Sequence, residues 1–416
     1  MAYILLAMLL LTIYFSSKLY GNMFNPISVF LGVNLVSLIL MYGLSGLNNE
    51  LSLTIWIVII IMFVSYLVGV CLGSFKYRLS SKKESKVKKT SRQRLIYLLV
   101  VYCVIYNISA FCYLWKLDTT YGLFSFLSKL AEMNVAFQAG EFNIGIITHF
   151  LPLAYTISLL VLYHIKYYGG NMILYIQYIL CYIPAISPRR DTLFYLIFMS
   201  LVFVFMTSKK ASTDEELKKY FKIFSISSIA LWLMSVSQSL LNKASESNFR
   251  LFNLPIPASL NDSVIYIAGN YPYLQKLYDF GQVNFYYFLI STLRIVYKYI
   301  FLLFGLSIDT TNIFDLPLYN VGSSHNFLFN TAPLVYYFIK ESGVFFFIGF
   351  IILGLVTQKL HNRFVSNKSA GNLLLASYAY FIVFFSFRSY NLIYLSTVLM
   401  LLYMLIAYFV IEVEKD

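Results

Sequence analysis

Residues 53–94 read LTIWIVIIIMFVSYLVGVCLGSFKYRLSSKKESKVKKTSRQR, an apolar run that changes abruptly into a basic one. The 21 residues 53–73 carry no charge, and a helix of about 20 apolar residues crosses the hydrocarbon core of a bilayer. Residues 76–94 hold nine Lys or Arg and one Glu, and such loops face the cytoplasm. The stretch therefore predicts a transmembrane helix together with its direction.

Composition extends this interpretation to the whole chain. Its 416 residues are 60% hydrophobic and 12% charged, whereas about 25% of the residues in soluble domains are charged. We predict an all-α polytopic membrane protein with about eleven spans. The candidate spans are residues 2–16, 26–44, 53–73, 95–116, 146–164, 171–187, 192–207, 223–241, 343–360, 371–387 and 390–411.

The remaining basic loops agree on one orientation. Residues 164–170, 208–222 and 359–368 carry Lys or Arg and are expected in the cytoplasm, with the N-terminus outside. The outer face then receives loops 45–52, 117–145, 188–191 and 388–389 and the long segment 242–342. We expect three regions: about eight spans in residues 1–241, an outward-facing segment at 242–342, and about three spans in 343–416.

Residues 285–306 (FYYFLISTLRIVYKYIFLLFGL) are the one part of the outer segment long enough to span. If they crossed the bilayer, the basic residues 359–368 would face outside, against the positive-inside rule. Arg294 and Lys298 at the middle would each cost about 2.5–3.5 kcal/mol. We therefore expect an amphipathic helix in the outer interface, or a re-entrant piece covered by protein.

Several classes of function are disfavoured. The net charge of +13 lies largely in short loops, where it sets orientation, and no nucleic-acid motif accompanies it. The four cysteines lie in apolar spans without a CxxC pair, which indicates core residues and neither disulfides nor ligands. No P-loop, Rossmann fingerprint, HExxH or DxD motif is present. We expect no metal and no cofactor.

Pro188-Arg189-Arg190-Asp191 is the first candidate site. Two arginines in a short outer loop work against the positive-inside tendency. A functional reason is an anionic ligand, because guanidinium grips phosphate oxygens through two parallel hydrogen bonds and stays charged. The alternative is that Arg189 and Arg190 pair with lipid headgroups or with Asp191.

Ser324-His325-Asn326 is the second candidate site. His325 is the only histidine of residues 242–342, and histidine is the side chain best suited to take a proton near neutral pH. We identify His325 as a candidate catalytic base and Asn326 as a candidate substrate-binding residue. A structural role for the loop histidine is the alternative.

Four further outer residues are candidates for substrate binding. Arg294 and Lys298 are four residues apart and share one helical face. With Arg250, they meet either headgroups or the same anion as Arg189 and Arg190. Glu341, where the chain re-enters the membrane, either caps a helix or orients a base and binds a sugar hydroxyl.

The sequence also resembles a known family. Residues 319–364, YNVGSSHNFLFNTAPLVYYFIKESGVFFFIGFIILGLVTQKLHNRF, look like the hallmark region of Wzy-type polysaccharide polymerases, within the O-antigen polymerase/ligase superfamily. There a loop with His-Asn or Asn-Thr precedes an acidic residue, a Gly and a Gly-containing span. Residues Asn330-Thr331, Glu341, Gly343, Gly349 and Gly354 fit, as do Met23-Phe24-Asn25-Pro26, Tyr266-Ile267-Ala268-Gly269 and the outer Arg189-Arg190. Many members carry Asp-aromatic-Gly where this chain has Glu341-Ser342-Gly343, which weakens a carried-over role for Glu341.

The resemblance implies a GT-C-like, metal-independent glycosyltransferase of the bacterial plasma membrane, with its active site on the periplasmic or extracellular face. Donor and acceptor would be undecaprenyl-pyrophosphate-linked glycans. Arg189 and Arg190, together with Arg250 or Arg294, would stabilise the departing pyrophosphate, and His325 would take the proton of the attacking hydroxyl. Implied partners are membrane lipids, a chain-length regulator and a flippase, and no nucleic acid.

Two other functions stay open. A ligase of the same superfamily would share the Arg and His residues and differ in its acceptor. A flippase or other transporter of lipid-linked oligosaccharide is disfavoured, because transporters tend to show internal repeats and charges at mid-membrane.

Overall fold

The computed structural model describes residues 2–22, 24–80, 90–122, 129, 132, 145–183, 191–207, 250–256, 258–284, 288–289, 291–305, 316–323, 327–389 and 391–412. Within these ranges the chain is predominantly α-helical, and its strands form two-residue hairpins. Seven of the described helices are long and apolar enough to cross a membrane. They are Pro26–Gly43, Leu53–Ser74, Arg92–Tyr121, Gly145–Tyr168, Leu334–Ser366, Ala370–Phe387 and Leu395–Glu412. Each overlaps a predicted span, although Leu334–Ser366 begins nine residues before the predicted span 343–360, and the chain is a multi-pass membrane protein.

The other predicted spans are described in part. Helices α1 (Ala2–Tyr20) and α8 (Asp191–Thr207) contain the shorter apolar stretches Leu5–Tyr20 and Tyr195–Thr207. Helix α7 (Met172–Leu180) has 9 residues where we predicted a span over 171–187. The predicted span 223–241 lies outside the described residues.

The chain divides into two compact units, each assembled from segments that are distant in sequence. Unit 1 comprises Met1–Glu84, Glu246–Asn362 and Ile382–Leu395. Unit 2 comprises Ser85–Ser245, Arg363–Phe381 and Ser396–Asp416.

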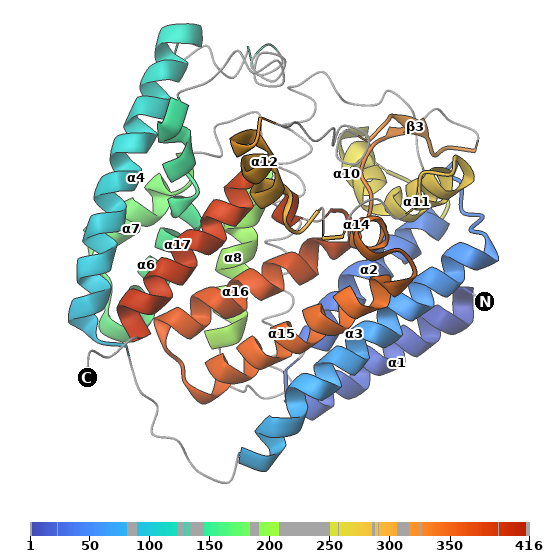
Figure 1. The fold of residues 1–416 in the computed structure, drawn as a ribbon, viewed down its shortest axis with the longest axis horizontal. Helices are drawn as coiled ribbons and strands as arrows, with labels where there is room; N and C mark the ends of the chain where they lie inside the picture. The colour runs from blue at the N-terminus through green and yellow to red at the C-terminus, as the bar shows by residue number, and fades with distance from the viewer. Residues whose placement is uncertain are drawn as a thin grey trace. The chain divides into compact units, whose positions relative to one another are not determined.

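The core of unit 1 is aromatic. Helices α1, α2 (Pro26–Gly43) and α3 (Leu53–Ser80) lie side by side, and α15 (Phe346–Ser366) runs next to α3 (Figure 1). The fully buried ring of Phe30 stacks on Tyr66 at 3.9 Å and lies 6.0 Å from Phe350. The Tyr66 hydroxyl donates to the Pro26 carbonyl (3.0 Å), so a polar group deep in the core is satisfied.

Glycines bring α3 and α15 into backbone contact. A methyl group on Gly69 would lie 2.1 Å from the carbonyl oxygen of Ile351, and one on Gly354 would lie 2.3 Å from that of Tyr66. Such distances are too short for any side chain. In a bilayer this close approach supplies the van der Waals contact that holds helices together, because lipid tails are as apolar as the helices.

A group of short elements, the cap, belongs to the predicted outer part of unit 1, and Figure 1 shows two of its helices beside α2. It contains α10 (Ala258–Ala268), α11 (Asn270–Asp279), α12 (Arg294–Leu303), α14 (Leu334–Ser342) and the 3-10 turns Gly343–Phe345, Phe385–Phe387 and Asn391–Ile393. Buried hydrogen bonds dock the cap on α2. Ser37 donates to the Ile267 carbonyl (2.6 Å), and the Tyr271 hydroxyl donates to Asn34 (2.7 Å).

Unit 2 contains α4 (Arg92–Tyr121), the 3-10 helix Gly145–Phe150 that leads into α6 (Leu153–Tyr168), α7, α8 and most of α16 (Ala370–Phe384) and α17 (Leu395–Glu412). Tyrosine hydroxyls and amides cross-link it inside the apolar environment. Tyr102 donates to the Tyr403 carbonyl (2.9 Å), and Tyr403 donates to the His149 carbonyl (2.9 Å). The amides of Asn107 and Gln177 pair reciprocally at 2.9 and 3.2 Å.

The glycine contact makes a stability prediction. Gly354→Ala should destabilise the protein by about 1–3 kcal/mol, because overpacking forces the two helices apart. Gly32 on α2 is the matched control, since a methyl group there meets nothing within 4 Å. Gly32→Ala should be neutral or stabilise by up to about 1 kcal/mol through helix propensity. Thermal unfolding of both variants in the same detergent checks this, and equal melting temperatures would contradict the contact.

Candidate functional site

The turn that follows α2, residues 44–48, organises the predicted outer surface of unit 1. It binds a first hairpin, in which β1 (Arg250–Leu251) pairs with β2 (Leu254–Pro255). Phe252 and Asn253 at its turn have φ of 51° and 67°, as tight two-residue hairpin turns require. Ser45 donates its backbone N–H to the Arg250 carbonyl (2.8 Å) and accepts from the Arg250 N–H through its hydroxyl (3.0 Å). The backbone of Arg250 is thus fixed, while its side chain is exposed.

The same turn binds a second hairpin, formed by β3 (Tyr319–Asn320) and β4 (Leu328–Phe329). The Ser323 N–H donates to the Gly46 carbonyl (2.7 Å), and the Asn48 N–H donates to the Val321 carbonyl (2.9 Å). Arg250 pairs with Ser45, and Ser323 pairs with the next residue, Gly46. Two inter-strand Cα distances of about 5.5 Å and one step of about 3.8 Å along the chain therefore place the backbones of Arg250 and Ser323 at most about 15 Å apart.

Asn320 holds the two sides of the second hairpin together. Its Oδ1 accepts from the N–H groups of Gly322 and Phe327, each at 2.9 Å. The predicted residues Ser324, His325 and Asn326 lie outside the described residues, between Ser323 and Phe327. The structure therefore fixes the backbone on both sides of the candidate base, and the role of His325 stays a prediction.

A chain of aromatic rings attaches the second hairpin to α10 and α11. The Phe329 ring lies 5.9 Å from Tyr266 and 5.7 Å from Tyr273, and Tyr273 lies 5.9 Å from Tyr319. Burial raises the pKa of the Tyr273 phenol, so this group stays protonated and donates to the Pro317 carbonyl (2.7 Å). The hairpin is held by packing along its length, not only at its ends.

Arg388 is a cation that the sequence analysis did not single out. Its guanidinium lies 5.4 Å from the centre of the Tyr266 ring, the ring that packs on Phe329. Residues 388–389 were predicted to form a two-residue outer loop. An arginine in so short an outer loop works against the positive-inside tendency, as Arg189 does. Arg388 could therefore have been identified from the sequence.

Two residues of α14, Tyr337 and Glu341, lie near the start of α12. Glu341 is buried on α14, and its carboxylate accepts a hydrogen bond from the Thr292 N–H. Arg294 lies within electrostatic reach of the Tyr337 hydroxyl, also on α14. Glu341 thus positions the start of α12, and its role in substrate binding stays a prediction. The backbone of Lys298 lies in α12, whereas its side chain lies outside the described residues.

Helix α12 has 10 residues, about 15 Å at 1.5 Å per residue, half the thickness of the hydrocarbon core. This helix alone does not span. Its exposed side chains Val296, Ile300 and Leu303 follow a helical spacing. The expected interfacial or re-entrant position stays a prediction, because the structure contains no membrane.

Arg189 and Arg190 lie outside the described residues. In the chain they precede α8, which begins at Asp191. The gathering of these arginines with the cations of unit 1 around one anion therefore stays a prediction.

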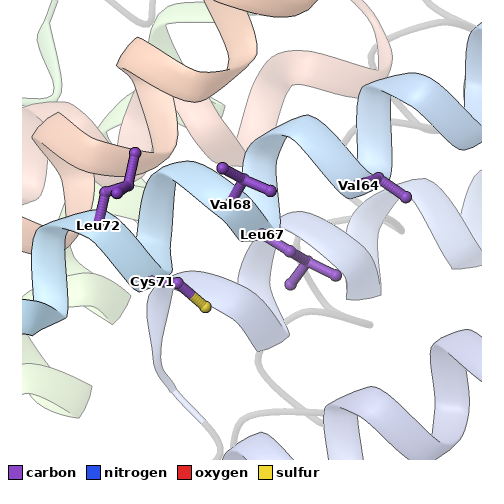
Figure 2. A pocket seen from close by; sticks show the side chains of 5 residues that line it. All are labelled: Val64, Leu67, Val68, Cys71 and Leu72. Carbon is purple, nitrogen blue, oxygen red and sulfur yellow. The ribbon is translucent and has the colours of Figure 1, made fainter.

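Two other features of the described residues bear on the choice of site, the acidic and metal-binding side chains and a groove on α3. No group of three or more His, Cys, Asp or Glu side chains that could hold a metal ion occurs there. A groove of about 340 Å³ on α3 is lined by the apolar side chains Val64, Leu67, Val68, Cys71 and Leu72 (Figure 2). These side chains offer no acid, base or cation for catalysis.

Comparison with known proteins leaves the family open. No protein-family model matches the chain, and no curated protein or solved structure is significantly similar to it. Its function must therefore be inferred from its own residues and their arrangement.

The role of Asn320 is testable without knowing the reaction. In Asn320→Ala the amides of Gly322 and Phe327 lose their acceptor, so we expect their hydrogen exchange to rise roughly tenfold, for a loss of about 1.4 kcal/mol. Asn320→Asp keeps an acceptor oxygen and should preserve protection. Peptide-level exchange by mass spectrometry measures this. Unchanged exchange in the alanine variant would show that the hairpin is held by its aromatic packing alone.

Proposed function

We propose that this protein is a glycosyltransferase that polymerises undecaprenyl-pyrophosphate-linked oligosaccharide repeat units into a surface polysaccharide. It would act in the bacterial plasma membrane as a GT-C-like bundle of about eleven spans, with its site on the outer face. One observation carries the proposal. The hairpin of Arg250 and the hairpin that flanks His325 are bonded to consecutive residues of one turn, Ser45 and Gly46.

The proposed reaction joins two lipid-linked glycans. A hydroxyl of the acceptor attacks the anomeric carbon of the donor, and the bond from that carbon to the pyrophosphate oxygen breaks. The electron pair leaves with undecaprenyl pyrophosphate, and the hydroxyl proton passes to His325. Histidine suits this step because its pKa lies near neutral pH. The leaving group supplies the driving force, so the reaction needs no nucleotide.

The outer cations would stabilise the departing pyrophosphate. Arginine forms paired, charge-assisted hydrogen bonds to phosphate oxygens, which are strongest where water is scarce. We assign Arg189 and Arg190 to this role, with Arg250, Arg294 and Lys298 as further contacts to the diphosphate. Arg388 joins this set because its ring partner Tyr266 packs on the second hairpin.

The remaining candidates would bind sugar or position other groups. Asn326, next to the proposed base, would bind a sugar hydroxyl through its amide. Glu341 would act chiefly by holding Thr292 and so the start of α12. Membrane lipids surround the spans, and a flippase and a chain-length regulator are the proposed protein partners.

The glycan profile of a deletion strain tests the reaction. Deletion should leave single repeat units on their carrier, and the wild-type gene should restore a ladder of lengths. Arg190→Ala should lower the ladder by about 100-fold, because one group that stabilises developing charge contributes about 2.7–4 kcal/mol. His325→Ala should lower it by about 100-fold or more, because a positioned general base contributes about 10²–10⁴-fold. Arg190→Lys is the matched variant that keeps the charge and loses the planar fork.

Other profiles would replace the proposal. Finished polymer trapped on its lipid carrier would identify a ligase, and repeat units accumulating inside the cell would identify a flippase. A full ladder in Arg190→Ala, with the protein present in the membrane, would remove Arg190 from the mechanism.

The proposed topology has its own test. In Ser324→Cys, a membrane-impermeant thiol reagent should label intact cells or spheroplasts. Ser366→Cys, at the predicted cytoplasmic end of α15, should label only after permeabilisation and serves as the control. Labelling of Ser324→Cys only after permeabilisation would place the candidate base on the wrong face of the membrane.

A further inference from the structure

An exposed aromatic stack lies beside the second hairpin and has no role in the reaction described above. Phe280, which follows α11, is 59% exposed, although it is a large apolar side chain. Its ring lies 4.7 Å from that of Tyr319 on β3, with 19° between the ring planes. One face of Phe280 is therefore covered by a fixed partner, and the exposure lies on the rest of the ring.

One polar side chain contacts this stack, and two others belong to residues close to Phe280 in the chain. The Gln282 amide donates to the Tyr319 hydroxyl (3.0 Å), and the exposed Asn284 donates to the Gly281 carbonyl (2.8 Å). The exposed Asp279, next to Phe280, accepts from the Gln275 amide (2.6 Å). Each of these groups retains further donor or acceptor capacity, because an amide can make four hydrogen bonds and a carboxylate about four.

An exposed flat ring with amides and a carboxylate on neighbouring residues has the chemistry of a sugar-binding surface. The face of an aromatic ring carries negative charge density, which attracts the slightly positive C–H groups on the flat side of a pyranose. Amide and carboxylate groups bind the hydroxyls at the rim of the same sugar. A lipid tail would favour an apolar rim instead.

The stack is joined to the candidate site through one strand. Tyr319 lies four residues before Ser323 on the second hairpin, about 13 Å at the rise of an extended strand. Tyr319 is also held from α11 by the ring of Tyr273 at 5.9 Å. This distance suits an oligosaccharide that extends away from the reacting sugar and not the reacting sugar itself.

We propose that Phe280, stacked on Tyr319 and close in the chain to Gln282, Asn284 and Asp279, is a glycan-binding subsite for a pyranose of the growing chain, distant from the bond being formed. The inference rests on the proposed function, since it assigns the bound glycan to the polymer. Its role is to retain the chain between additions, so its loss shortens the product without abolishing the linkage reaction.

Binding without turnover is the first readout. The probe is a mixture of oligosaccharides released by mild acid from the cells' own surface polysaccharide, and the receptor is the full-length protein in nanodiscs. Saturation-transfer NMR should show wild-type binding, weakened about tenfold in Phe280→Ala, as expected for loss of an aromatic contact of about 1.4 kcal/mol. Phe280→Tyr keeps the ring and should bind as wild type.

Leu318→Ala is the matched control, because Leu318 is also 59% exposed and precedes Tyr319. It removes exposed apolar surface without removing a ring, and it should leave binding unchanged. In cells, Phe280→Ala should shift the ladder to shorter lengths, while Leu318→Ala should not. Equal binding by wild type and Phe280→Ala, or no binding by the wild type, would overturn the subsite.

The two proposals fail in different ways. A wild-type ladder combined with unaltered binding in Phe280→Ala removes the subsite and leaves the polymerase. Glycan binding that depends on Phe280, in a protein whose deletion does not affect the ladder, keeps the subsite and removes the polymerase.

Discussion

The backbone contact between α3 and α15 is the constraint on which unit 1 depends. In water, helices associate because apolar side chains leave the solvent, but within lipid that driving force is lost and shape must replace it. Gly69 and Gly354 supply the shape, since the carbonyls of Ile351 and Tyr66 occupy the space of their missing side chains. The Tyr66 ring then stacks on Phe30, which carries the constraint from α3 to α2.

Buried hydrogen bonds carry the same constraint from α2 to the cap. Asn34 accepts from the Tyr271 hydroxyl and donates to Ser386 (3.2 Å), and the preceding residue of α11, Asn270, accepts from Thr331 just beyond β4 (3.2 Å). All of these except Thr331 are buried. A buried polar group that loses its partner is costly where water is absent, so these bonds allow few alternative positions of the cap.

The sequence predicted what depends on composition and missed what depends on distant partners. Apolar length and basic loops located the seven long helices, because the bilayer imposes both. Gly354 was noted only as part of a resemblance, since its contact with Tyr66 cannot be inferred from local sequence. The two hairpins could not be predicted, because strands of two residues are too short to show an alternation of apolar and polar side chains. His325 was selected by its chemistry. The short predicted outer loop pointed to Arg388 in the same way as to Arg189, but its contact with Tyr266, in another segment, could not be inferred from the sequence.

The glycine contact between α3 and α15 and the buried hydrogen bonds of α2 together determine the position of the turn at residues 44–48. This turn ends α2, so it inherits the position that Phe30 and Asn34 give that helix. Residues 44–48 include no acidic, basic or cationic side chain, yet hydrogen bonds from their backbone fix the positions of Arg250 and Ser323. Groups that act on one bond must be held to within fractions of an ångström by supporting residues. A methyl group at Gly354 would displace α3, against which α2 packs, so it can move the turn at residues 44–48 without contacting it.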